Sequence, residues 1–214
     1  MDLMVKNPFL GLVALGPIDP DILRRLCPTI AKFLLLPVRV LHPKPLPPQT
    51  YHLVRHQYHA TQLLEYLLGD DSDAFRILGV TAEDLYIPIF TFVFGEAQLD
   101  GKAAVISMFR PRGDADGSTP TKSLFLGRML KLSLHELGHT FGLGHCREDD
   151  CLMGFSSNLE ILDRKDIVFC DYCQILLTDY FRDQGLRPPL KWYAETHAPD
   201  APTPTVDNSR KHRS

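Results

Sequence analysis

The stretch HELGHTFGLGHCREDDC, residues 135–151, places three histidines, two glutamates and two cysteines within 17 residues. His135 and His139 are four residues apart, so on a helix they lie on one face, one turn apart. Their ring nitrogens can then reach a common ion at about 2.0–2.1 Å. Gly142 permits a sharp break in the chain, because glycine tolerates positive φ. His145 can therefore fold back and supply a third nitrogen.

Three protein ligands leave the fourth position of a tetrahedral zinc ion for water, which is typical of a catalytic site. Zinc lowers the pKa of such a water toward about 7. Glu136 is no ligand in this H-E-x-x-H-x-x-G-x-x-H pattern, and it is placed to take the proton of the water and pass it to a leaving amine. The alternative is a histidine-rich helix end without metal, but the glycine and third histidine at the correct offsets favour zinc.

Four of the five cysteines form two close pairs, C-x4-C and C-x2-C, separated by 18 residues: Cys146, Cys151, Cys170 and Cys173. Four thiolates close a tetrahedral zinc site with no place for water, which indicates a structural ion. Cys170 and Cys173 could instead be small core residues or a redox pair, which would leave the other two without a role. Because His145 adjoins Cys146, we expect two zinc ions per chain, the structural ion supporting the third ligand of the catalytic one.

The chain has 214 residues, 44% of them hydrophobic, and a net charge of −3. This length suits one domain with a real core. This charge indicates no broad basic surface that would bind nucleic acid or an anionic membrane. The apolar runs are too short to span a bilayer. The N-terminus lacks the features of a signal peptide. Paired cysteines without a signal peptide indicate a reducing compartment, so we expect a cytoplasmic monomer with free thiols.

Several elements must position these residues. Apolar runs predict strands at 10–16, 37–41, 76–81, 87–99 and 101–109, the last two joined by a tight turn at 99–102. Helical spacing and end signals predict helices over about 20–35, 56–69, 122–141 and 163–184. Helices alternating with strands favour an α/β fold, with helices packed on a mixed sheet. The proline-rich, polar segment 195–214 is expected to be disordered.

A second group of histidines lies upstream. His52, His56 and His59 are spaced at i, i+4 and i+7 around the start of the predicted helix 56–69. On a helix this spacing would form a stripe that could bind metal. Because no cysteine or carboxylate joins the three in register, we interpret them as solvated polar residues.

The eleven-residue zinc motif followed by a methionine, Met153, resembles the metzincin clan of zinc peptidases. The order H-E-x-x-H-x-x-G-x-x-H-C, then x4-C-x-M, then C-x-x-C is similar to the archaemetzincin family. The segment LGVTAEDLYIPIFTFVFGEA, residues 78–97, is similar to that family too. The resemblance spans about residues 10–185.

This resemblance implies a metzincin-like zincin fold: a twisted mixed sheet, a backing helix, an active-site helix and a smaller C-terminal part. It implies a catalytic zinc at His135, His139 and His145 with Glu136 as base, and a structural zinc at the four cysteines. Met153 would lie in a tight turn beneath the catalytic metal, a packing role that an ordinary core methionine also fits.

We therefore expect a zinc metallopeptidase that acts on peptides or proteins. Residues 1–194 would form one catalytic domain, with an N-terminal part of about 1–142 and a C-terminal part of about 143–194. Segment 90–97 could bind substrate as an edge strand by β-augmentation, or could be a buried core strand. Two rivals are a catalytically silent, zinc-stabilised peptide-binding module and a cysteine-zinc module for nucleic acid. The acidic balance counts against the second.

Overall fold

The computed structural model describes residues 7–69, 72–114 and 117–189. The predicted tail at 195–214 and the first six residues lie outside these ranges. Within them, no helix combines the length and apolar character needed to cross a membrane.

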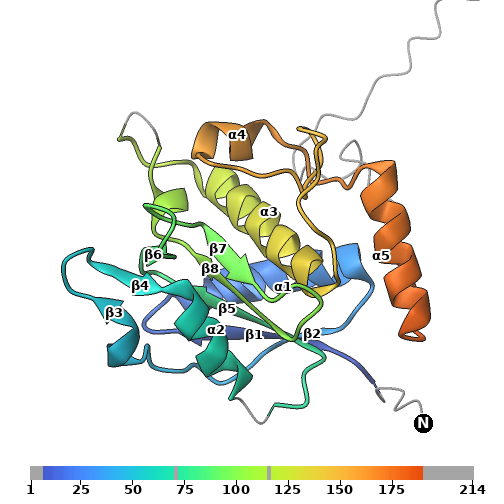
Figure 1. Ribbon diagram of the computed structural model, residues 1–214, viewed down its shortest axis with the longest axis horizontal. Helices are drawn as coiled ribbons and strands as arrows, with labels where there is room; N and C mark the ends of the chain where they lie inside the picture. Colours follow the sequence, from blue (N-terminus) through green and yellow to red (C-terminus); the bar gives the residue numbers. More distant parts are fainter. Residues whose placement is uncertain (1–6, 70–71, 115–116, 190–214) are drawn as a thin grey trace, which may run out of the picture.

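A five-stranded sheet forms the centre of the fold, in the order β2-β1-β5-β8-β7 (Figure 1). Its strands are β1 Leu10–Leu15, β2 Val38–Val40, β5 Arg76–Thr81, β7 Gly95–Ala97 and β8 Ala103–Ser107. The first three of these and β8 run parallel, whereas β7 pairs antiparallel with β8 at the edge. The sheet is therefore mixed, and the residues of β1, β5 and β8 are almost all buried because both faces of the sheet are covered.

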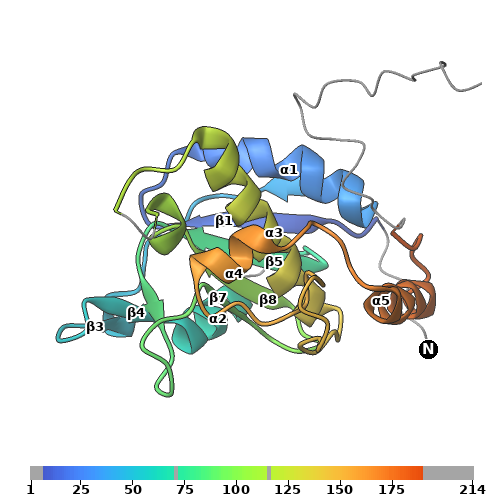
Figure 2. The same cartoon turned by 90° about the horizontal axis from the view of Figure 1, so that it is seen from above.

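The described residues form five α-helices: α1 Pro20–Leu34, α2 Ala60–Leu68, α3 Lys122–Thr140, α4 Leu159–Arg164 and α5 Asp171–Asp183. Helices α1 and α3 pack on one face and α2 on the other (Figures 1 and 2). Asp19 caps α1, its carboxylate accepting a hydrogen bond from the Asp21 N–H. The Thr121 hydroxyl caps α3 by accepting from the Leu124 N–H.

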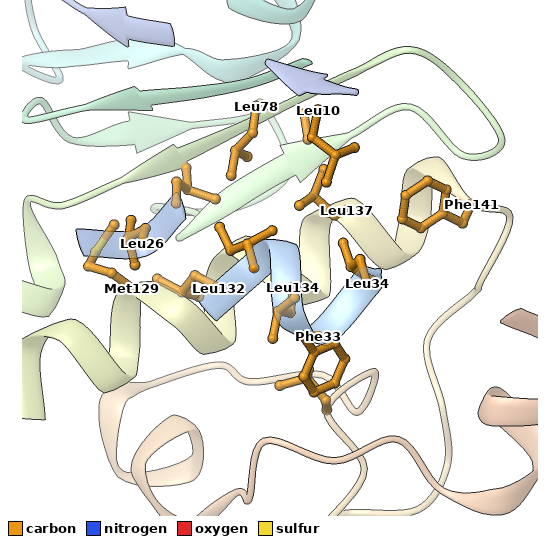
Figure 3. Close-up of a cluster of buried hydrophobic side chains, with 14 of the residues drawn as sticks. Leu10, Leu26, Phe33, Leu34, Leu78, Met129, Leu132, Leu134, Leu137 and Phe141 are labelled. Carbon is orange, nitrogen blue, oxygen red and sulfur yellow. The ribbon is translucent and has the colours of Figure 1, made fainter. Parts of the chain in front are cut away.

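The larger core lies between the sheet, α1 and α3 (Figure 3). Leu134 and Leu137 of α3 are fully buried there, and Phe141 follows directly after the helix. Helical spacing in the sequence predicts one apolar stripe of five residues: Leu126, Leu130, Leu134, Leu137 and Phe141. The last three are core residues, joined by Met129 and Leu132. This packing fixes α3 on the sheet. It therefore also fixes the positions of the side chains on the neighbouring face of the helix.

The predicted helix at 56–69 is correct only from Ala60 onward. Residues 57–59 form strand β4, which pairs with β3 Tyr51–His52 and with β6 Leu85–Tyr86 in a small second sheet. His56 has a φ of 53°, which no helix contains. His52, His56 and His59 therefore share no helical face. The spacing of these few residues fits a helix, and it carries no sign of the strand pairing that forms here instead.

The predicted strand at 87–99 is also shorter than expected, since only β7 is a strand of the main sheet. At residues 90–91, side chains donate hydrogen bonds to the backbone carbonyls that would pair with a neighbouring strand in a sheet. Arg55 donates to the carbonyls of Phe90 and Thr91 at 2.8 and 2.9 Å, and the Gln57 amide also donates to Thr91. The tight turn to β8 is confirmed.

The predicted helix at 163–184 is two helices, α4 and α5, separated by an extended segment at 165–170. In this segment the Val168 carbonyl accepts a hydrogen bond from the Leu152 N–H. Phe169 is buried against Phe33 of α1, with ring centroids 5.5 Å apart. These long-range contacts override the local helical pattern, and they place Cys170 directly before the first turn of α5.

Candidate functional site

Three histidines converge at the C-terminal end of α3. His135 and His139 lie one turn apart on the helix, with their Nε2 atoms separated by 3.1 Å. Gly142 has a φ of +84°, which breaks the chain as expected. His145 then returns, and one ligand nitrogen from each of the three rings lies within 4.8 Å of the others. Two nitrogens bound to a tetrahedral zinc at 2.0–2.1 Å would be about 3.3 Å apart, so this spacing fits zinc.

Backbone carbonyls orient two of the rings. The Nδ1 atom of His135 lies 2.7 Å from the Leu152 carbonyl oxygen, and the Nδ1 atom of His139 lies 2.6 Å from that of Leu143. Only a protonated Nδ1 can donate to a carbonyl, which leaves Nε2 with a free lone pair. Carbonyl partners of this kind are the usual support of metal-binding histidines.

The protein also keeps these imidazoles uncharged. Burial lowers the pKa of His135 to about 3, and the neighbouring His139 adds to this effect. Burial likewise lowers the pKa values of His139 and His145. Because a metal competes with protons for the imidazole nitrogen, lowered pKa values favour metal binding at neutral pH.

Glu136 lies between α3 and the edge strand β7. It is 6% exposed. A side chain on Gly95 of β7 would place its first carbon 2.7 Å from the Oε1 atom of Glu136, so the carboxylate rests directly against this glycine. Burial, with a smaller contribution from the negative charge of Glu96, raises the pKa of Glu136 to about 8. The side chain is therefore a proton acceptor and donor suited to neutral pH.

A cleft of about 560 Å³ contains the histidines and Glu136. Strand β7 and the segment before it form one wall, and α3 with the segment after Met153 forms the other. Phe90 and Phe155 meet at the rim with ring centroids 6.1 Å apart, and Phe155 also packs edge-on against His145. The volume is that of a small-molecule or peptide site, and its lining is mainly apolar.

The open edge of β7 faces this cleft. In the pairing with β8, the Phe94 carbonyl accepts from the Ser107 N–H and the Gln98 N–H donates to the Ala103 carbonyl. Backbone groups alternate in direction along an antiparallel strand. Gly95 and Ala97 therefore direct their N–H and C=O groups away from β8. The segment 90–97 is neither all edge strand nor all core, since only its last three residues form a strand.

The four predicted cysteines form a second cluster behind the cleft. Their sulfur atoms all lie within 4.8 Å of one another, and all four are free thiols. The Sγ atoms of Cys146 and Cys170 are 3.6 Å apart, close to the ~3.8 Å expected for two sulfurs at 2.3 Å from one tetrahedral zinc. Backbone N–H groups of Glu148 and Cys170 point at the sulfurs of Cys146 and Cys151, at 3.4 and 3.3 Å.

One short segment connects the two clusters. The Cys146 N–H donates to the Met153 carbonyl at 2.9 Å, and Cys146 and Gly154 form a parallel β-bridge. Met153 is fully buried, and its sulfur lies against Gly138 of α3, one residue before His139. The structure thus brings together every site residue that the sequence indicates. Phe155 and the close approach of Gly95 to Glu136 belong to no spacing motif, so the sequence did not indicate them.

Comparison with known proteins agrees with this geometry. Residues 29–179 match the model for Peptidase family M54. Archaemetzincin of Methanopyrus kandleri is 47% identical over 132 residues, covering 62% of this chain and 72% of that protein. Its crystal structure superposes with a TM-score of 0.74 at 40% identity, covering 82% and 96% of the two chains.

A solved zinc-dependent peptidase from Methanocorpusculum labreanum is 30% identical, with a TM-score of 0.69 and coverage of 78% and 98%. The fold is therefore that of a zinc metallopeptidase. The chain belongs to Peptidase family M54, and its resemblance to the archaemetzincins is confirmed.

Proposed function

We propose that His135, His139 and His145 hold the catalytic zinc of this peptidase, and that Glu136 is its general base. The observation that supports this most strongly is the convergence of three uncharged imidazoles on one point of the cleft, beside a buried carboxylate. Three nitrogen ligands leave one coordination position open, as catalysis requires.

When bound, the zinc ion supplies a Lewis acid at the substrate carbonyl and lowers the pKa of the attacking water. Glu136 takes the proton of this water as the water attacks. The same carboxyl group then delivers the proton to the leaving amine. A carboxyl group whose pKa has been raised by burial is suited to both transfers, because its affinity for the proton is neither negligible nor excessive near pH 7.

The substrate in this proposal is a peptide in extended conformation, which binds along β7. The outward N–H and C=O groups of Gly95 and Ala97 pair with its backbone, as in β-augmentation. This pairing places a peptide bond next to Glu136, because the Glu136 carboxylate rests on Gly95. The apolar cleft walls then accept the side chains that flank the cleaved bond.

We further propose a second zinc ion, bound by Cys146, Cys151, Cys170 and Cys173. Four sulfur ligands exclude water from the metal, so this ion is structural. It joins the segment after His145 to the start of α5. Because Leu152, Phe169 and Phe181 pack into the main core, the C-terminal part belongs to the same folding unit as the sheet.

The test is the variant Glu136→Gln, which keeps the size of the side chain but cannot accept the proton. It should retain the zinc content of the wild type and lose at least about 100-fold in kcat. Peptide-library cleavage and metal analysis on the same samples measure both quantities. A variant with the full wild-type rate would show that another group is the base. An inactive wild type would favour a catalytically silent peptide-binding module.

A further inference from the structure

Lys165 carries an unusual buried charge next to the cysteine cluster. The residue is the C-cap of α4 and is only 4% exposed. Its ammonium donates to the carbonyl oxygens of Asp149 and Cys151, at 2.9 and 3.2 Å. Both acceptors belong to the turn that runs from Cys146 to Met153. The lysine thus fills the inside of the turn that connects the histidines to the cysteines.

The turn is built around this ammonium. At Gly154 an added Cβ would collide with the Lys165 Nζ atom and would come within 3.0 and 3.1 Å of the Glu148 and Cys151 carbonyl oxygens. Glycine at 154 therefore leaves the space that the lysine head group occupies. Gly154 also bridges to Cys146, a member of the cysteine cluster.

Among the described residues, no carboxylate forms an ion pair with this ammonium within 4.0 Å. The side chains of Asp149 and Asp150 are nearby in sequence, but both residues are exposed, where solvent screens their charge. A buried cation without a partner is costly, so buried charges are normally compensated. Two carbonyl dipoles and the two screened carboxylates leave much of the charge of Lys165 uncompensated.

We propose that Lys165 is the counter-charge of the zinc–thiolate centre at Cys146, Cys151, Cys170 and Cys173. Four thiolates around one Zn²⁺ leave a net charge of about −2. The ammonium lies against the Cys151 backbone, inside the turn that holds Cys146 and Cys151. Lys165 thereby raises the zinc affinity of the cysteines, and the loaded centre in turn stabilises the turn that presents His145. This inference rests on the proposed second zinc and is independent of peptidase activity.

The experiment uses the full chain with His135→Ala and His139→Ala, so that the cysteines are the remaining zinc site. Lys165→Gln and Lys165→Met are compared in this background by competition with a chelator. Glutamine can still donate hydrogen bonds to the two carbonyls, but it has no charge. We expect both variants to lose at least about 10-fold in zinc affinity, the range for groups that support metal ligands. Lys131→Met is the matched control, because Lys131 also donates to two carbonyls, those of Leu162 and Asp163.

Urea unfolding with and without zinc distinguishes two roles of Lys165: balancing the charge of the zinc–thiolate centre, and holding the turn by hydrogen bonds alone. Without metal there is no zinc–thiolate centre for the lysine to balance, so Lys165→Gln should be at least as stable as its parent. With zinc it should be less stable. A zinc affinity equal to that of the parent, or equal destabilisation in both states, would overturn the proposal for Lys165. A parent that binds no zinc would overturn the cysteine site together with it.

Discussion

Gly95→Ala is a small change that should disable the site without removing the metal. The added methyl would lie 2.7 Å from the Glu136 Oε1 atom and 2.7 Å from the Val105 carbonyl oxygen, whereas real Cβ atoms essentially never approach closer than 3.0 Å. Ordinary contact begins at 3.4 Å, so the carboxylate and the strand must both give way by about 0.7 Å. The carboxylate can rotate away, whereas relief from the Val105 carbonyl needs β7 to shift relative to β8.

A displacement of about 1 Å at a catalytic group costs on the order of 100-fold in rate. We therefore expect kcat to fall by roughly 10- to 100-fold, which corresponds to about 1.4–2.7 kcal/mol. Overpacking should also lower the free energy of unfolding by about 1–3 kcal/mol. Zinc content should not change, because the three histidines are held from α3 and from the turn at 142–145.

The assay combines kcat on a cleaved library peptide, zinc analysis and urea unfolding. The matched control is Gly127→Ala, on the same helix as Glu136, where an added Cβ meets no atom within 4 Å. This control should keep its activity and gain up to about 1 kcal/mol, because alanine favours the helix. If Gly95→Ala retains the wild-type kcat, the placement of Glu136 against β7 does not matter for catalysis, and the reasoning fails.

Two further predictions concern protons and the connection between the clusters. In the metal-free chain, the folded pKa of Glu136 is raised to about 8 from 4.5, so its contribution to stability is full below pH 4.5 and is lost as the pH rises through about 8. Glu136→Gln should therefore stabilise the metal-free protein at pH 8 and have little effect at pH 4, as measured by urea unfolding; equal effects at both pH values would refute the shift. Cys146→Ser should weaken zinc binding at the histidines by about 10-fold, because the Cys146 side chain, as a ligand of the proposed second zinc, fixes the turn after His145. Unchanged competition with a chelator at the histidine site would contradict this connection.

The parts of the fold that could be predicted from sequence were those governed by local rules. The first strand, α1 with its Asp19 cap, α3 with its apolar stripe and the turn before β8 all follow from side-chain periodicity and end signals. The seven ligand positions came from spacing, and the structure brings them together in two clusters. Spacing succeeds here because a tetrahedral ion demands few and definite arrangements of its ligands.

The errors lie where distant contacts decide the local structure. The backbone at 90–91 is bound by Arg55, 35 residues away, and not by a neighbouring strand. The segment at 165–170 is extended because its side chains make distant contacts. Phe169 packs into the core, and the Lys165 ammonium binds a backbone carbonyl in the turn between Cys146 and Met153. No periodicity within these segments carries that information. The role of Gly95 is likewise visible only after β7 and α3 are placed side by side.

We propose that the chain uses two zinc ions, one for reaction and one for structure. The most direct measurement is the zinc content of the wild type and of a His135→Ala/His139→Ala variant, with peptide-library cleavage on the same samples. We predict two ions in the wild type and one in the variant, together with loss of cleavage. A wild type with a single ion, or a variant that still cleaves peptides, would contradict the claim.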